Sequence, residues 1–169
     1  MVDGAQSVPH LPTSVAADDI DFLVFSGHKV YGPTGVGIVY GRQSRLEEME
    51  PVVFGGHMIS EVTVERSVWS RPPAKFEAGT PNIAGAIGLS AAIDWLQKSN
   101  NQQIVQHKSL LLKEFYNGLT AIKGIDILSS SVHNAGIVAL NVDSEHPADV
   151  AELLNQQKIA VRSGQHCAM

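Results

Sequence analysis

Cysteine is almost absent from this 169-residue chain, which contains only Cys167. A single thiol excludes an intrachain disulfide and a zinc site built from several cysteines. Long apolar runs are also lacking, since none approaches the roughly 20 residues that a helix needs to cross a bilayer. Met1 is followed by Val-Asp-Gly-Ala-Gln rather than by a signal peptide. We therefore expect a cytoplasmic protein that spans no membrane.

The chain also lacks clustered positive charge. The net charge is −5, the pI is about 5.7, and lysine and arginine are scattered without a run. A nucleic-acid partner normally requires a basic face, so none is expected. The composition, with 44% apolar and 17% charged residues and no repeat or low-complexity tract, is typical of a globular protein. No metal site is expected, because these histidines show no metal-ligand spacing: His10, His57, His107, His133 and His146.

The first half of the chain is rich in short apolar segments that are typical of strands. The stretch "DIDFLVFSG" predicts a buried strand at about 21–25, and "GVGIVYG" predicts another at 35–41. Segments 52–54 and 61–69 alternate like partly exposed strands. The prolines and the glycine of "RPPAKFEAGTPN" predict a loop after them.

From Pro81 onward the apolar residues recur with a helical period. They predict a mostly buried helix from Pro81 through about Lys98, and a second helix over about 102–122 with Gly124 at its C-terminal cap. The remaining predicted elements are strands at 125–128, 136–142 and 158–163, and a helix from Pro147 to about Gln157.

This order of elements predicts an α/β protein in two domains. Residues 100–169 read α-β-β-α-β, which is typical of a two-layer unit with helices on one face of a small sheet. Residues 1–99 read as the strand-rich edge of a larger α/β sheet, so we place the boundary near Asn100. Because "MVDGAQ" looks like a strand end without its strand, and "VRSGQHCAM" stops after a glycine loop, we expect the chain to be part of a longer protein.

Lys29, in "FSGHKVYGPTGVG", is the first candidate for chemistry. It follows a buried strand directly, and a lysine beside the low-dielectric interior is favoured in the neutral amine form that Schiff-base chemistry requires. The glycines after it allow a ligand to approach the backbone closely. The alternative is a lysine that caps the strand and extends to water. Position alone favours that alternative.

Asp3 and Gln6 lie just after an apparent strand end, where α/β sheets place ligand-binding groups. An aspartate there could pair with a cationic ring nitrogen, although a residue of this type before glycine is also an ordinary turn former. Ser26, His28 and Thr80 could each donate a hydrogen bond to a phosphate oxygen. Thr80 could also serve as the N-cap of the helix that Pro81 opens.

Cys167 lies in "RSGQHCAM", close in sequence to Arg162 and His166. Cationic neighbours favour the thiolate, which is the nucleophilic form of cysteine. A buried, inert cysteine is the commoner case for a lone thiol. Because a glycine loop with Gln and His is no obvious core segment, the pattern leaves both interpretations open.

Together these motifs resemble one family. The stretches "DGAQSVPH", "DFLVFSGHKVYGPTGVGIVYG", "FEAGTPN" and "IAVRSGQHCAM" occur in this order and at these separations in the class V aminotransferases. The resemblance runs from Val2 to Met169 and is strongest to the Suf-type cysteine desulfurase and selenocysteine lyase group. It implies a PLP fold type I large domain followed by most of a small two-layer α/β domain, with pyridoxal 5′-phosphate (PLP) as cofactor.

The resemblance also implies roles for the candidate residues. Lys29 resembles the lysine that carries PLP covalently, and Asp3 the aspartate that pairs with the ring nitrogen. Gln6 would hydrogen-bond the ring hydroxyl oxygen, and Ser26 and His28 would hold the phosphate. The last cofactor residue, Thr80, resembles the threonine that reaches the phosphate in the neighbouring subunit, which implies a homodimer.

Cys167 resembles the catalytic cysteine of this group. The implied reaction converts L-cysteine to L-alanine and leaves a persulfide on Cys167, which a sulfur-acceptor protein collects for iron-sulfur cluster assembly. Arg162 and His166 would shape the loop around the thiol. The alternatives that stay open are a selenocysteine lyase, another class V enzyme of the kynureninase or epimerase type, and a non-catalytic module that binds a second copy or an acceptor protein.

The chain departs from the family pattern in two motifs and lacks other parts. It has "VFGGHMI" where the family commonly has "GGGxMI", and Gln165 stands where a histidine is commoner. We expect small effects on loop polarity from both. The ring-stacking histidine, a phosphate-binding threonine, most of the large sheet and the arginine that binds the substrate carboxylate have no counterpart here. We therefore expect this chain by itself to lack useful desulfurase activity.

Overall fold

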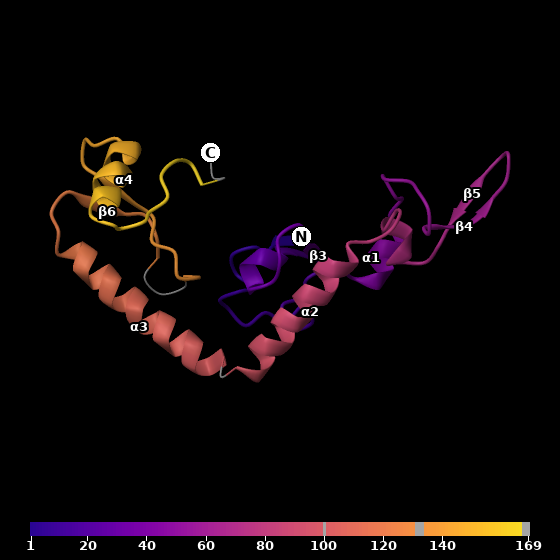
Figure 1. Ribbon diagram of the computed structural model, residues 1–169, viewed down its shortest axis with the longest axis horizontal. Coiled ribbons are helices and arrows are strands. Elements are labelled where there is room, and N and C mark those ends of the chain that lie inside the picture. The colour runs from indigo at the N-terminus through magenta and orange to yellow at the C-terminus, as the bar shows by residue number, and fades with distance from the viewer. Residues whose placement is uncertain (100, 131–133, 167–169) are drawn as a thin grey trace. The chain divides into compact units, whose positions relative to one another are not determined.

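The computed structural model describes residues 1–99, 101–130 and 134–166 (Figure 1). Contacts divide the chain into two compact units, Met1–Asn101 and Gln102–Met169. Two sequence predictions fall outside the described residues: the boundary residue Asn100 and the candidate nucleophile Cys167. Within the described ranges no helix is long and apolar enough to cross a membrane.

A three-stranded sheet forms the centre of the first unit. Its strands are β1 (Val2–Asp3), β2 (Phe22–Ser26) and β3 (Gly37–Gly41), in the order β1-β2-β3. β1 runs parallel to β2, with Asp3 opposite Val24, and β3 runs antiparallel to β2. Leu23 of β2 is buried in the core. The strands predicted at 21–25 and 35–41 are thus confirmed in position to within two residues. The burial predicted for the second strand is wrong, because Val39 of β3 is 68% exposed.

Charged residues flank this sheet where β3 ends and the short helix α1 (Gln43–Glu48) begins. Arg42 donates to Asp19 at 2.6 Å and lies 3.4 Å from Asp21. The Arg42 guanidinium lowers the pKa of the Asp19 carboxyl through this hydrogen bond and through its charge. Sequence reasoning missed α1, because six residues are too few for a clear helical period.

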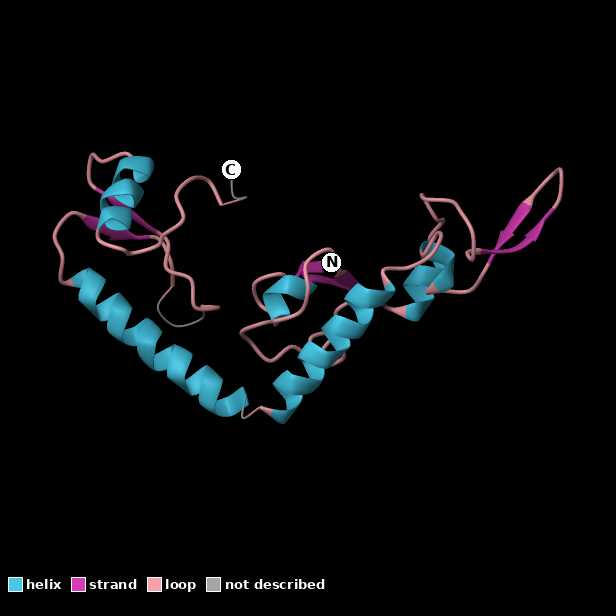
Figure 2. Ribbon diagram, in the orientation of Figure 1, coloured by secondary structure: helices cyan, strands magenta, loops and turns pink. Residues whose placement is uncertain are grey.

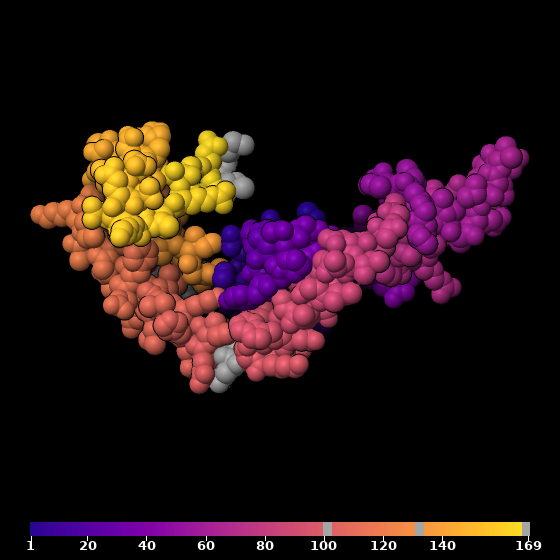
Figure 3. Space-filling model, in the orientation of Figure 1, coloured from indigo at the N-terminus to yellow at the C-terminus, as the bar shows by residue number. Residues whose placement is uncertain are grey.

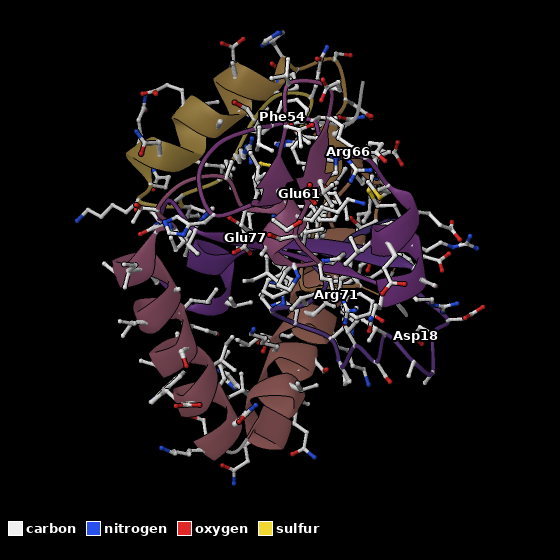
Figure 4. The ribbon with its side chains drawn as sticks, turned by 90° about the vertical axis from the view of Figure 1, so that its right-hand side faces the viewer. Asp18, Phe54, Glu61, Arg66, Arg71 and Glu77 are labelled. Carbon is white, nitrogen blue, oxygen red and sulfur yellow. The ribbon has the colours of Figure 1, made fainter. Side chains whose placement is uncertain are left out.

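The strands β4 (Ile59–Val62) and β5 (Ser67–Trp69) form an antiparallel hairpin in the segment predicted to alternate. Arg66 lies 3.8 Å from Glu61 across the hairpin, and both are labelled in Figure 4. Phe54 packs against Trp69 with ring centroids 5.2 Å apart. The strand predicted at 52–54 is wrong. Val52 and Val53 form a bend and Phe54 is irregular, because Gly55 and Gly56 follow at once and no described strand pairs with them.

Helix α2 (Ile83–Lys98) begins two residues after Pro81, because Asn82 is its N-cap. The Asn82 side chain accepts a hydrogen bond from Gly85 N at 2.9 Å. The N-cap role considered for Thr80 is therefore wrong. The prediction of a mostly buried helix is also wrong, since Ile87 is 66% exposed. The space-filling view shows α2 open over much of its length on the face presented (Figure 3), because it packs along one stripe only.

The second unit contains α3 (Asn101–Thr120) apart from its first residue, together with β6 (Ile125–Ile127), β7 (Leu140–Val142) and α4 (Pro147–Gln156), shown by type in Figure 2. β6 and β7 pair antiparallel, and α4 packs against β7. Gly124 adopts a φ of +82° in the turn before β6. The C-terminal cap predicted at Gly124 is wrong, because α3 ends four residues earlier, at Thr120. His146 accepts from Ala148 N at 3.2 Å and caps α4.

Two strand predictions in this unit need correction. The strand expected at 136–142 begins only at Leu140, because the Asn134 side chain accepts from Ile137 N at 2.7 Å and folds that segment into a turn. The strand expected at 158–163 is absent from the described residues. Its apolar residues Ile159 and Val161 are about half exposed, and no ladder pairs with them.

Candidate functional site

The carboxyl ends of β1 and β2 lie at one edge of the sheet, because the two strands are parallel. β1 ends at Asp3, whose register partner Val24 is two residues before the end of β2. Gly4 N donates to Val24 O at 2.7 Å and turns the chain away from the sheet. A Cβ on Gly4 would lie 2.7 Å from Leu23 Cδ1, so a larger residue would have to displace the buried Leu23 side chain.

Asp3 and Gln6 are both exposed at this edge. Asp3 Oδ1 accepts a hydrogen bond from Ala5 N at 2.9 Å, which is the turn-forming role considered for this aspartate. A carboxylate has two oxygens that accept hydrogen bonds, so the turn and a contact to a ligand are compatible. The turn fixes the orientation in which the carboxylate is presented.

Lys29 lies in a single 3-10 turn, η1 (Gly27–Val30), that directly follows β2. Its side chain is half-buried, whereas that of His28 is exposed. Ser26 Oγ and His28 Nδ1 lie 2.9 Å apart, so a hydroxyl and an imidazole stand together at the strand end. Both groups can donate hydrogen bonds to an anion. The edge therefore brings together an amine, a carboxylate, a hydroxyl and an imidazole.

Close backbone packing holds the Lys29 turn. Gly27 N donates to Val36 O at 2.9 Å, and a Cβ on Gly27 would lie 2.9 Å from the same oxygen. Gly32 N donates to Gly27 O, also at 2.9 Å. These bonds close the loop onto itself between β2 and β3, which limits the directions in which Lys29 can point.

Gly32→Ala is expected to destabilise the protein. The added Cβ would lie 2.9 Å from both Gly27 O and Leu89 Cδ1, and the first of these is backbone that cannot rotate away. Overpacking of this kind costs about 1–3 kcal/mol. Chemical denaturation measures the free energy of unfolding. Gly118→Ala in α3 is the matched control, because nothing lies within 4 Å of its Cβ position. Equal stability of the two variants would contradict the packing described.

Thr80 lies apart from this edge, in the loop before α2, and is exposed. It lines a cavity of about 230 Å³ together with His57 and Glu77. Gly79 N donates to Gly56 O at 2.8 Å and joins the two loops that form this cavity. His57, from the "VFGGHMI" segment, thus lies beside a predicted site residue.

A larger cavity, of about 470 Å³, contains none of the predicted site residues. It is lined partly by Glu50, Trp69, Arg71 and Lys75. Lys75 is only 7% exposed and donates to Glu47 O at 3.1 Å. Sequence reasoning missed this burial, because a lysine in a proline-rich loop is normally exposed. The candidate site is assigned to the β1–β2 edge, because α/β sheets bind ligands where their parallel strands end.

Arg162 and His166 belong to the second unit and are both exposed. His166 has a φ of +53°, in the left-handed region that a non-glycine residue adopts at some cost. Cys167, the next residue, lies outside the described residues. In the described ranges no group of three or more His, Cys, Asp or Glu residues is placed to hold a metal ion.

Comparisons with known proteins agree with one another. The profile of the family Aminotransferase class-V matches residues 1–169. A probable cysteine desulfurase of Halalkalibacterium halodurans is 47% identical over 99% of this chain. The cysteine desulfurase CsdA from Escherichia coli superposes with a TM-score of 0.90 at 41% identity over 98% of this chain. A mutant of C-DES with glycine covalently linked to its PLP cofactor superposes with 0.80 at 27% over 95%.

These matches cover only part of each relative. The chain spans 41% of the length of the Halalkalibacterium protein, 41% of CsdA and 43% of C-DES. The α/β fold found here is thus a part of the fold of those enzymes. Because the family profile matches the whole sequence, the chain belongs to the class V aminotransferase family.

Proposed function

We propose that this chain is the part of a PLP-dependent cysteine desulfurase that anchors the cofactor and carries the sulfur-accepting cysteine. The observation that carries the proposal is the parallel pairing of β1 with β2. It places Asp3 and the Lys29 turn at the same edge of one sheet. Relatives at 41–47% identity that are named cysteine desulfurases support it.

The groups at this edge fit PLP. Lys29 offers the one chemistry that can hold the cofactor covalently, and Asp3 can accept a hydrogen bond from the protonated ring nitrogen. Gln6 would donate to the ring hydroxyl oxygen. Ser26 and His28, 2.9 Å apart, would hold the phosphate. PLP, when bound, supplies an electron sink that stabilises negative charge at the substrate α-carbon.

The protein's own residues would carry the remaining steps. The Lys29 amine would remove and return a proton at the substrate α-carbon. The Cys167 thiolate would attack the substrate sulfur, so that a sulfur–sulfur bond forms as the carbon–sulfur bond breaks. The electron pair of the broken carbon–sulfur bond stays on the carbon. That carbon is then protonated, and the product released is alanine. Arg162 would favour the thiolate by its charge, and both Arg162 and His166 would shape the loop around the thiol.

Thr80 would contact the phosphate of a second copy's cofactor, which makes the active protein a homodimer. Its place in a cavity outside the β1–β2 edge supports a role separate from that edge. We further propose that the persulfide passes to a sulfur-acceptor protein for iron-sulfur cluster assembly in the cytoplasm. For this chain by itself, a non-catalytic binding module is the second candidate, and the exposed apolar residues of α2, such as Ile87, favour it.

Product analysis tests the proposal. The protein expressed from its complete reading frame is incubated with PLP and, in separate reactions, with L-cysteine, L-selenocysteine and L-kynurenine. We expect alanine from L-cysteine in amounts equal to the sulfur bound by protein or released on reduction. Alanine from selenocysteine alone would indicate the lyase. Alanine from kynurenine alone would indicate the kynureninase type and contradict the proposal.

The chain of 169 residues is the natural comparison in the same assay. We expect it to release no alanine above the protein-free background, because it spans only 41% of the length of the cysteine desulfurases that it matches. Turnover by the 169-residue chain at the rate of the complete protein would contradict this expectation.

A further inference from the structure

Tyr31 is held in a conformation that non-glycine residues rarely adopt. Its backbone has φ +65° and ψ 7°, in the left-handed region, and its N–H donates to Gly27 O. The next residue, Gly32, would adopt such a conformation without strain and donates to the same oxygen. A tyrosine at this position persists only where its surroundings compensate for the strain.

The side chain of Tyr31 has such a partner on α2. Its ring lies 5.7 Å from the ring of Trp95, measured between centroids, with the planes tilted by 59°. This is a favourable geometry for two aromatic rings. The two residues are 64 positions apart in the sequence, so their contact joins the end of the Lys29 turn to the last part of α2.

Two further contacts join α2 to the same loop. The Asn82 side chain donates to Gly35 O at 2.9 Å at the start of the helix. In the middle, the Cβ position of Gly88 lies 3.1 Å from Pro33 Cγ. Gly88 and Trp95 are seven residues apart, two helical turns, and therefore lie on one face. One stripe of α2 thus supports the loop after Lys29 from end to end.

We infer that Trp95 is a positioning residue for Lys29, acting through Tyr31; the inference rests on the proposed function. Lys29 lies two residues before Tyr31, and a backbone rotation at Tyr31 would reorient the short turn that carries the amine. The two rings are 53% and 55% exposed, so their contact adds little to the core. Val30 and Leu89, 3% and 2% exposed, hold the turn against the helix, whereas the aromatic pair fixes its rotation.

The experiment compares Trp95→Ala, Trp95→Phe and Gln97→Ala in the protein from the complete reading frame. Gln97 is the control because it is an exposed residue of the same last part of α2 that has no place in the proposed site. The first readout, on the PLP-free protein, is hydrogen exchange of the Tyr31 and Gly32 amides, both of which donate to Gly27 O. The second is the rate at which added PLP forms its covalent absorbance band.

In Trp95→Ala we expect amide exchange to rise by about two- to tenfold and band formation to slow by a similar factor, which corresponds to losing one aromatic pair. Trp95→Phe should restore both, and Gln97→Ala should change neither. Faster exchange without slower band formation would overturn the inference, because the pair would then be structural only. Unchanged exchange and unchanged band formation would overturn it as well. A wild-type protein that forms no covalent band would instead contradict the proposed function itself.

Discussion

Replacing Lys29 with alanine is expected to abolish covalent attachment of PLP and to lower alanine release from L-cysteine by at least about 10²–10⁴-fold. That factor is the contribution of a positioned group that moves a proton in the transition state. Loss of the Schiff base adds to it, because the cofactor then dissociates freely. The visible absorbance band and a coupled assay of alanine measure the two effects.

Two variants control this experiment. Lys29→Arg keeps the positive charge at the end of β2 but cannot form a Schiff base, and we expect it to fail like alanine. Lys123→Ala removes an exposed lysine from the second unit and should leave both measurements unchanged. If Lys29→Ala kept the absorbance band and the activity, Lys29 would be an ordinary strand-end lysine that extends to water, which was the alternative favoured by its position alone.

Replacing Cys167 with alanine is expected to lower alanine release from L-cysteine to the background of the PLP-free protein, while the covalent PLP band persists. The thiolate is the group that accepts the substrate sulfur, and without it the carbon–sulfur bond has no nucleophile to break it. Mass analysis of the peptide that contains Cys167 should show an added sulfur after exposure of the wild type to L-cysteine. The same peptide from the alanine variant should show none.

Selenocysteine separates the two candidate activities in that variant. Retained alanine release from L-selenocysteine, together with loss on L-cysteine, would assign the thiol to sulfur transfer alone. Full activity of Cys167→Ala on L-cysteine would contradict the proposed role and leave Cys167 as an inert small residue. Gln165→His, which restores the commoner family residue beside it, should change the rates little.

The sequence predicted the parts of the fold that depend on local pattern. The apolar run of β2 placed Lys29 at a strand end, and Pro147 marked the start of α4. Predictions failed for segments whose structure depends on a partner that is distant in the sequence. Residues 52–54 and 158–163 have strand-like sequences but no strand to pair with in the described chain. A strand is stable only within a ladder, and ladder partners cannot be read from a single segment.

The candidate site likewise contains residues that local sequence patterns predicted and residues that they did not. Asp3, Ser26, His28 and Lys29 were predicted from strand ends and motif order. They lie at one sheet edge, and their roles stay predictions. Trp95 was not found, because nothing in its own helix indicates that it would meet Tyr31. The sequence suggested Thr80 as the N-cap of α2, whereas the structure shows Asn82, and the reason is comparable. Both residue types cap helices well, and the hydrogen bond to Gly85 N decides between them.

The most direct test of the central claim is to locate PLP on the protein. The holoprotein is reduced with borohydride, which fixes a Schiff base irreversibly, then digested and mapped by mass spectrometry. The account predicts one modified lysine, Lys29, in the peptide that contains "SGHKVYGP". Modification of the buried Lys75 instead, or of several lysines to similar extents, would contradict the assignment of the site to the β1–β2 edge.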